Sequence, residues 1–155
     1  DALVVGASES LFMTTGAAAA VKRRGGATIE RDAVEQGPIA PGGVVVTSGG
    51  TLATPYVVHA VAVGHDRVAD AERLASAVRA AVALAEPLRL RRLAFALLGT
   101  EHGAFGPTDA ADVLVATLLE AADATPIESV VIATHHADES RAVADAIGRH
   151  RTAVS

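Results

Sequence analysis

Leu93-Ala-Phe-Ala-Leu-Leu-Gly-Thr-Glu-His-Gly-Ala-Phe-Gly-Pro107 is the stretch around which the chain is organised. Its first six residues are almost continuously apolar, which is typical of a strand buried on both faces of a sheet. Three glycines in the loop that follows allow backbone conformations that a side chain would block. Pro107 then suits the first turn of a helix, whose free amide groups favour an anion such as phosphate. The stretch therefore predicts either an anion-binding loop or an ordinary strand-to-helix connection.

Strand and helix patterns alternate along the rest of the chain, which predicts an α/β fold. We expect a three-layer α/β/α sandwich around a mixed, mostly parallel sheet. In such sheets ligands bind beyond the carboxyl ends of the strands, so the loops after Val5, Leu98 and Ala133 are the candidate site. The predicted strands are Ala2–Val5, Val44–Ser48, Tyr56–Val63, Leu93–Leu98 and a buried Ser129–Ala133; the predicted helices are Ala17–Arg24, Ala27–Gln36, Asp66–Ala85, Asp109–Ala122 and Asp138–Arg149.

Composition sets limits on the class of protein. The 155 residues are 50% hydrophobic but only 3% aromatic, so we expect one domain, residues 1–155, with a core of small aliphatic side chains. The absence of cysteine excludes disulfides and thiolate metal sites. A net charge of −5 with scattered cations argues against nucleic acid as a partner. No apolar run reaches the roughly 20 residues of a membrane span and no signal-peptide pattern is present, so we expect a cytoplasmic location and no membrane contact.

Four segments, taken in order, resemble one known family. Asp1-Ala-Leu-Val-Val-Gly-Ala-Ser-Glu9 is similar to Asp-Ala-Ile-Val-Asn-Ala-Ala-Asn, and Thr14-Thr-Gly-Ala-Ala-Ala-Ala-Val21 is similar to Gly-Gly-Gly-Val-Ala-x-Ala-Ile. Gly43-Val-Val-Val-Thr-Ser-Gly49 with Tyr56-Val-Val-His-Ala-Val61 resembles the family's Gly-x-Ala-x-x-Thr-x-Gly and Val-Ile-His-x-Val strands. Ala96-Leu-Leu-Gly-Thr-Glu-His-Gly-Ala-Phe105 resembles a phosphate-cradling loop, Pro-Leu-Leu-Gly-Thr-Gly-x-Gly-Gly-Leu. The family is the macro domain, which binds ADP-ribose and related nucleotides and has some members that hydrolyse ADP-ribosyl links or O-acetyl-ADP-ribose.

The resemblance covers Asp1 to about Arg149 and implies a set of ligand-binding residues. Backbone amides of Thr15, Gly16 and Ala17 and of the loop after Leu98 are implied to contact the ligand, with Glu9 and His135 near a ribose. No metal and no cofactor are implied. The full implied set is Gly6, Glu9, Thr14, Thr15, Gly16, Ala17, Gly99, Thr100, Glu101, His102, Gly103, Ala104, Phe105 and His135.

The first loop departs from the family pattern. Gly6 and Glu9 stand where the family has asparagines, so two amide side chains are replaced. Glu9 can accept hydrogen bonds from ribose hydroxyls, but its charge repels a nearby diphosphate. Thr14 and Thr15 replace two of three glycines, which narrows the close approach of the backbone to phosphate.

Two further departures concern chemistry and base recognition. Ala18 falls where hydrolytic members often carry an acidic residue that orients water, so we expect no hydrolase activity. Glu101 stands where the second loop would have glycine, and a carboxylate there opposes a diphosphate. The family's first strand and its Gly-Asp-Ile segment, which supplies an adenine-binding Asp, have no counterpart after Asp1. We therefore expect a fragment of a longer chain, or a first strand supplied from elsewhere.

Histidines and hydroxyls carry weaker hypotheses. His59 in an apolar strand predicts a structural, hydrogen-bonded histidine more than a catalytic one. His102 could contact a phosphate or move a proton, with an exposed loop residue as the alternative. His135, His136 and Asp138 could form a metal site, but adjacent strand residues point to opposite faces, so a solvated loop is favoured. No serine or threonine lies in a nucleophile elbow.

Three functions remain open on the sequence. The favoured one is a binding or sensing module for ADP-ribose or a related nucleotide, possessing no hydrolase activity. The second is a hydrolase that uses Glu9, Glu101 or His102 in place of the missing acid. The third is a degenerate scaffold for protein partners or fused domains, whose pocket is closed by Thr14 and Thr15 together with Glu101.

Overall fold

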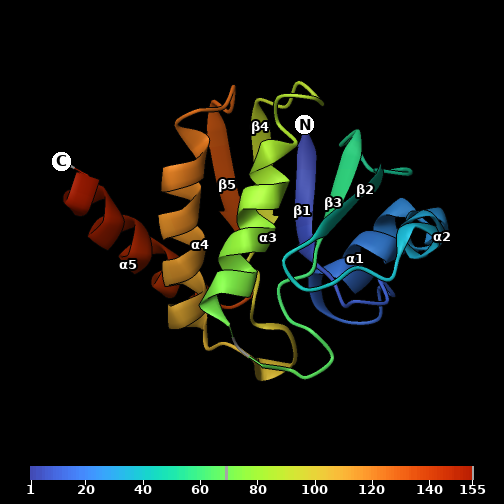
Figure 1. Cartoon of the computed structure of the whole chain (residues 1–155), viewed down its shortest axis with the longest axis horizontal. Helices are drawn as coiled ribbons and strands as arrows, with labels where there is room; N and C mark the ends of the chain where they lie inside the picture. Colours follow the sequence, from blue (N-terminus) through green and yellow to red (C-terminus); the bar gives the residue numbers. More distant parts are fainter. Residues whose placement is uncertain (69, 155) are drawn as a thin grey trace.

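The computed structural model describes residues 1–68 and 70–154, without the side chains of His102 and Val154. Within these residues the chain forms five strands, five α-helices and one short 3-10 helix (Figure 1). The strands are β1 (Ala2–Gly6), β2 (Val44–Ser48), β3 (Tyr56–Ala60), β4 (Arg92–Ala96) and β5 (Ser129–Ala133). The helices are α1 (Gly16–Gly25), α2 (Ala27–Gln36), α3 (Ala71–Ala83), η1 (Glu101–Gly103), α4 (Pro107–Ala122) and α5 (Ala137–Val154).

The strands form one sheet in the order β2-β3-β1-β4-β5. β1 lies at its centre and pairs in parallel with β3 and β4, placing Val4 beside Val58 and Phe95. β4 pairs in parallel with β5, whereas β2 runs antiparallel to β3. The predicted mixed, mostly parallel sheet is therefore confirmed. Because β1, β3 and β4 run in the same direction, the loops that follow them leave from one edge of the sheet (Figure 1).

Helices cover both faces of the sheet, as the three-layer prediction required. Ala2 and Val4 of β1 pack with α3 and α4 in the larger core cluster. Val5, the next residue along the strand, packs on the opposite face with Ile29 of α2 and residues of α1. This alternation follows from the period of two along a strand. α5 packs against α4 at one side of the molecule (Figure 1).

β5 is not the buried strand that its apolar sequence predicted. Val130 and Ile132 pack against the core cluster, but Val131 is 61% exposed on the other face. β5 is the last strand of the sheet, and the described helices on its side, α4 and α5, cover only one of its faces. A run of β-branched residues predicts a strand but does not distinguish an edge position from a central one.

Two predicted boundaries beside the site were also wrong. The helix predicted from Asp66 begins at Ala71, because Asp70 caps it: its carboxylate accepts hydrogen bonds from the amides of Glu72 at 2.8 Å and Arg73 at 3.3 Å. The strand predicted over Tyr56–Val63 ends at Ala60. The buried residues that follow it belong to a loop rather than to the sheet. No helix of the described chain combines the length and the apolar character that crossing a membrane requires.

Candidate functional site

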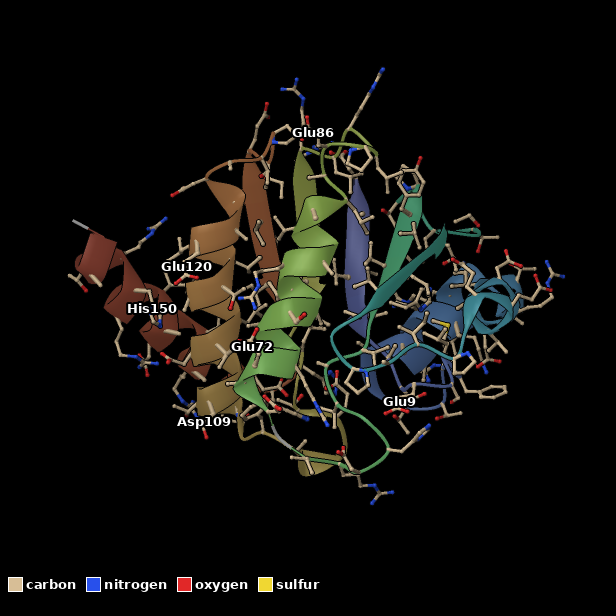
Figure 2. All side chains as sticks on the ribbon, in the orientation of Figure 1. Glu9, Glu72, Glu86, Asp109, Glu120 and His150 are labelled. Carbon is tan, nitrogen blue, oxygen red and sulfur yellow. The ribbon has the colours of Figure 1, made fainter. Side chains whose placement is uncertain are left out.

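A cleft of about 430 Å³ opens at the edge of the sheet where the parallel strands end. Figure 2 shows Glu9 at this edge, in the loop after β1, and Glu86 at the opposite edge. Three segments wall the cleft: the loop from β1 into α1, the loop after β3, and the loop after β4. The lining residues are Gly6, Ala7, Ser8, Phe12, Thr14, Thr15, Gly16, Ala17, Ala18, Val63, Gly64, His65, Arg67, Ala96, Leu97, Thr100 and Glu101.

The start of α1 forms the first wall. Thr15 is its N-cap residue, with extended backbone, and makes no side-chain capping hydrogen bond. The first amides of a helix have no partner inside the helix. Since no side chain caps them, the amides of Gly16, Ala17 and Ala18 are available at a surface that lines the cleft. The positive end of the helix dipole therefore favours an anion here.

The loop before α1 is held by a contact with a half-buried carboxylate. Met13, which is 1% exposed, donates its amide hydrogen to Glu30 of α2 at 2.7 Å. Lys22 donates to the same oxygen at 3.0 Å. The Met13 amide and then the Lys22 ammonium hold the pKa of Glu30 below its usual value. The first wall is thus fixed to both α1 and α2.

The loop after β4 forms the second wall and uses most of its own hydrogen-bond donors. Gly103 donates to Thr100 at 3.1 Å, Ala104 to Glu101 at 3.1 Å, and Phe105 to Gly99 at 3.0 Å. The amide of Gly99 donates to the Glu101 side chain at 2.8 Å. Four of the seven amides between Gly99 and Phe105 are therefore already engaged within the loop. Gly99 has φ +91°, a left-handed conformation in which glycine is strongly favoured.

Glu101 directs its carboxylate into the junction between the second wall and β1. Its Oε2 accepts the hydrogen bond from Gly99, and its Oε1 lies 1.6 Å from the point that a Cβ on Gly6 would occupy. A side chain at position 6 would require this carboxylate to move. Burial raises the pKa of Glu101 above its usual value, while the hydrogen bond from Gly99 acts in the opposite direction. No described cation offsets the cost of burial.

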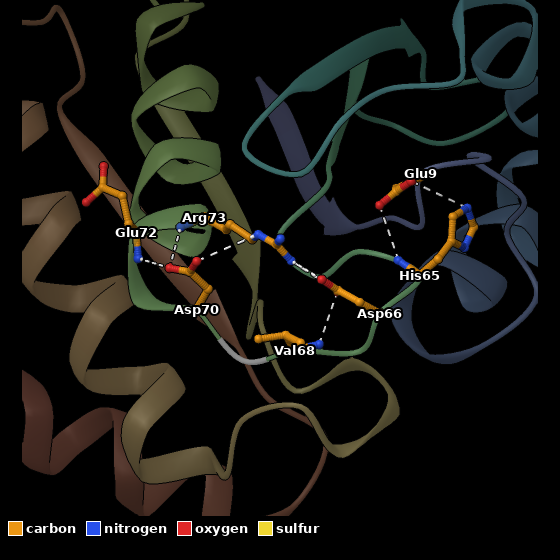
Figure 3. A network of polar contacts seen from close by, with 7 residues as sticks. All are labelled: Glu9, His65, Asp66, Val68, Asp70, Glu72 and Arg73. Carbon is orange, nitrogen blue, oxygen red and sulfur yellow. Dashed lines mark hydrogen bonds and ion pairs between the residues drawn. The ribbon is translucent and has the colours of Figure 1, made fainter.

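The third wall is the loop after β3, which presents His65 and Arg67 to the cleft. Glu9 is turned toward this loop: its Oε1 accepts from the His65 amide at 3.2 Å, and its Oε2 lies 3.6 Å from the His65 ring (Figure 3). Glu9 therefore joins the first wall to the third. Arg67 has φ +55°, which is uncommon for a residue with a side chain.

A salt-bridge network anchors the third wall to α3 (Figure 3). Arg73 donates to both carboxylate oxygens of Asp66, at 3.0 and 2.9 Å, and lies 3.7 Å from Asp70. Asp66 also accepts from the amide of Val68 at 3.2 Å. The hydrogen bonds from one guanidinium nitrogen of Arg73, followed by that from the Val68 amide, hold the pKa of Asp66 below its usual value. The loop is thus tied at both ends, although its side chains are largely exposed.

The predicted binding residues fall into three groups in the structure. Some line the cleft, and some belong to the loop after β4 but do not line the cleft. Two lie elsewhere, since Glu9 contacts His65 and His135 lines an adjoining groove. The side chain of His102 lies outside the described part of the chain. Lining the cleft are Gly6, Thr14, Thr15, Gly16, Ala17, Thr100 and Glu101; not among its lining residues are Gly99, Gly103, Ala104 and Phe105.

Sequence reasoning missed Phe12, His65 and Arg67. Phe12 is 54% exposed, an unusual degree for a phenylalanine, and lines the cleft. His65 and Arg67 were missed because the segment was divided between a predicted strand and a predicted helix. The positive φ of Arg67 has no sequence signature, but Gly64 followed by three polar residues is a loop signal that could have been used.

The adjoining groove begins where the cleft passes β4 and extends to the end of β5. His135 and His136 lie there with ring centroids 4.5 Å apart, and their amides donate to Glu139 at 2.8 and 3.2 Å. Glu139 therefore caps the start of α5. The described residues contain no group of three or more His, Asp or Glu side chains placed to hold a metal ion.

Comparison with known proteins agrees with this architecture. The Macro domain family matches residues 4–114. A macro domain-containing protein of Cupriavidus necator is 40% identical over 140 residues, which are 84% of this chain and 79% of that protein. An uncharacterized protein of Mycobacterium tuberculosis is 32% identical over 147 residues, which are 95% of this chain but only 41% of that protein. The chain thus spans less than half the length of this mycobacterial relative.

Solved structures give the same result for the fold. A mutant Oceanobacillus iheyensis macrodomain with ADPR superposes with a TM-score of 0.87 at 19% identity, covering 97% of this chain and 86% of that one. The Trypanosoma brucei macrodomain in complex with ADP-ribose superposes with a TM-score of 0.84 at 22% identity, covering 96% and 63%. The sequence matches and the fold together place the chain in the macro domain family.

Proposed function

We propose that the chain binds ADP-ribose or a related nucleotide in the cleft between α1 and the loop after β4. The observation that carries the proposal is the uncapped first turn of α1 facing a 430 Å³ cleft at the carboxyl ends of parallel strands. Two structural neighbours with the same fold are bound to ADP-ribose or ADP. The resemblance to the family's phosphate-cradling loop supports the same edge of the sheet as the binding site.

The lining provides complementary groups for the parts of such a ligand. The open amides of Gly16 and Ala17 suit a phosphate, and Arg67 adds a positive charge at the rim. Phe12 offers an exposed ring on which a sugar or a base can pack. An open cleft with free donors supports ligand binding over a scaffold closed by its own side chains.

A binding module without hydrolase activity fits the residues of the first wall. Ala18 lines the cleft at the position where the resemblance implies an acidic residue, and alanine cannot orient a water molecule. The second candidate is a hydrolase that uses Glu101, favoured by one observation: this carboxyl group lies in the cleft wall and burial raises its pKa, as general acids require. Release of ADP-ribose from an ADP-ribosylated protein or ester, lost in Glu101→Gln, would support the second candidate.

The test of binding is isothermal titration calorimetry with ADP-ribose, using two matched arginine variants. Arg67 and Arg89 are both exposed and both have φ +55°, but only Arg67 lines the cleft. We expect Arg67→Ala to weaken binding roughly tenfold and Arg89→Ala to leave it unchanged. Absence of heat and of thermal stabilisation at millimolar ADP-ribose, across pH 6 to 8, would refute the proposed ligand.

A further inference from the structure

Glu101 is the carboxylate of the cleft lining, and it already occupies a hydrogen-bond donor of the second wall. Its Oε2 accepts a hydrogen bond from the Gly99 amide at 2.8 Å, as a ligand oxygen would. Its Oε1 lies against Gly6, at the point where a side chain at that position would begin. A bound phosphate in this cleft would therefore lie beside a second anion, with the two competing for the same positive environment.

The groups facing Glu101 across the cleft do not neutralise it. His65 and Arg67 line the opposite wall and form no ion pair with Glu101 in the described residues. Glu9 is turned away to contact His65, and Asp66 is paired with Arg73. Burial raises the pKa of Glu101 even before a ligand arrives. An approaching anion acts in the same direction, because it disfavours the charged form further.

We propose that the cleft binds its anionic ligand together with one proton, which Glu101 accepts. Protonation removes the like charge and converts one carboxyl oxygen from an acceptor into a donor, able to hydrogen-bond a phosphate oxygen. Glu101 is then a specificity-determining residue, because the cleft favours an anion that can accept this hydrogen bond. The inference rests on the proposed function, since it concerns the same cleft and an anionic ligand of the same class.

Proton uptake is measured by titrating ADP-ribose into the protein in two buffers of different ionisation enthalpy at the same pH. The diphosphate diester of ADP-ribose carries no group that titrates near neutrality, so the proton count reports on the protein. We expect uptake approaching one proton per ligand at pH 8, and an affinity that falls by up to about tenfold per pH unit above neutrality. Glu101→Gln keeps the shape of the side chain and should abolish both effects, with affinity at pH 8 at least equal to wild type.

Three control variants show whether Glu101 itself is the group that takes up the proton. Glu101→Ala removes the side chain altogether and should match Glu101→Gln in losing proton uptake. His65→Gln removes the titratable group of the third wall and should keep the uptake at pH 8. Glu86→Gln alters an exposed carboxylate at the opposite edge of the sheet and should behave as wild type.

The possible outcomes distinguish this inference from the proposed function. Binding by wild type without proton uptake, or with the same uptake in Glu101→Gln, overturns the role of Glu101 and leaves ADP-ribose as the ligand. Binding by Glu101→Gln but not by wild type even at pH 6 means that Glu101 excludes the anion instead of carrying a proton, which also overturns the inference. No binding by either protein at any pH refutes both.

Discussion

Lowering the pH should destabilise the protein through His59, which is buried in β3 and is 0% exposed. Its Nε2 lies 2.9 Å from the hydroxyl of Thr47, and that hydroxyl donates to the carbonyl of Ser48 at 3.1 Å. Nε2 must therefore carry the hydrogen, and Nδ1, which has no partner among the described residues, is the bare nitrogen. A proton on Nδ1 would place an unpaired charge in the core, so burial lowers the pKa of His59 from 6.5 to about 4.

The magnitude follows from the difference between the two pKa values of His59. Because the folded-state pKa is lowered, the unfolded chain binds a proton more readily, and stability falls as the pH drops. Neutral His59 makes its full contribution to the free energy of unfolding above about pH 6.5. This contribution is lost as the pH falls toward 4. The loss amounts to about 2 kcal/mol at pH 5 and about 3 kcal/mol below pH 4. The total free energy of unfolding of a single domain is only about 5 to 15 kcal/mol, so this loss is easily measured.

The assay is urea denaturation at intervals between pH 7.5 and 4.5, for wild type, His59→Gln and His135→Gln. His135 is exposed at the end of β5, so its variant makes the same change of residue without burial. We expect the free energy of unfolding of wild type and of His135→Gln to fall in parallel below pH 6.5. That of His59→Gln should start lower but fall by about 2 kcal/mol less between pH 7.5 and 5. Equal slopes for all three proteins would refute a neutral, buried His59.

The remaining predictions concern the helices. Gly148 lies within α5, where an added Cβ would meet open space, so Gly148→Ala should raise stability by about 0.5 to 1 kcal/mol, measured as a higher Tm. Asp70→Ala should cost about 1 kcal/mol by removing the cap of α3, whereas Asp70→Asn, which can still accept the capping hydrogen bonds, should cost less; equal losses would contradict capping. Asp112 accepts a hydrogen bond from His150 at 2.9 Å, and this contact, followed by that from Arg149, lowers the Asp112 pKa. Asp112→Asn should therefore lower the protection of the α5 amides against hydrogen exchange at pH 7, measured relative to the intrinsic exchange rate at that pH. Acidification that protonates Asp112 should lower this protection in wild type as well, so that the difference between the two proteins shrinks.

The sequence predicted the fold well because the period of apolar residues and the residues that end helices and strands are local properties. The predicted bounds match the observed ones for two strands, Val44–Ser48 and Ser129–Ala133, and for one helix, Ala27–Gln36. The structural role predicted for His59 is confirmed by its contact with Thr47. The exposure of Val131 was not predictable in the same way, because it depends on which strand lies next to β5 and on which helices cover it. Those are tertiary facts that a run of apolar residues does not encode.

The candidate site was predictable in location but not in its detailed contacts. The loops after Val5, Leu98 and Ala133 were expected to converge. Residues of the first two line the cleft, whereas the loop after Ala133 lines only the adjoining groove. The loop after β3 was missed because Asp66 and Val68 continue a helical period that Asp70 interrupts by capping. An aspartate is a recognisable signal for the start of a helix, but the predicted start followed the apolar period of the longer segment instead. His65 lies in this loop, and it was overlooked for the same reason.

The glycine-rich loop after β4 illustrates why a motif alone does not establish a phosphate site. A phosphate is held by amide hydrogens that have no other partner, and here Gly99 donates to Glu101 while Phe105 donates back to Gly99. The glycines supply the conformation, but four of the loop's seven amides already have partners within it. The uncapped amides lie instead at the start of α1, beside Gly16. This segment has fewer glycines than the loop after β4 and is therefore a weaker sequence signal. The first wall is therefore the better candidate for an anion site, and under our proposal the protonation of Glu101 in the second wall decides whether the cleft accepts an anion.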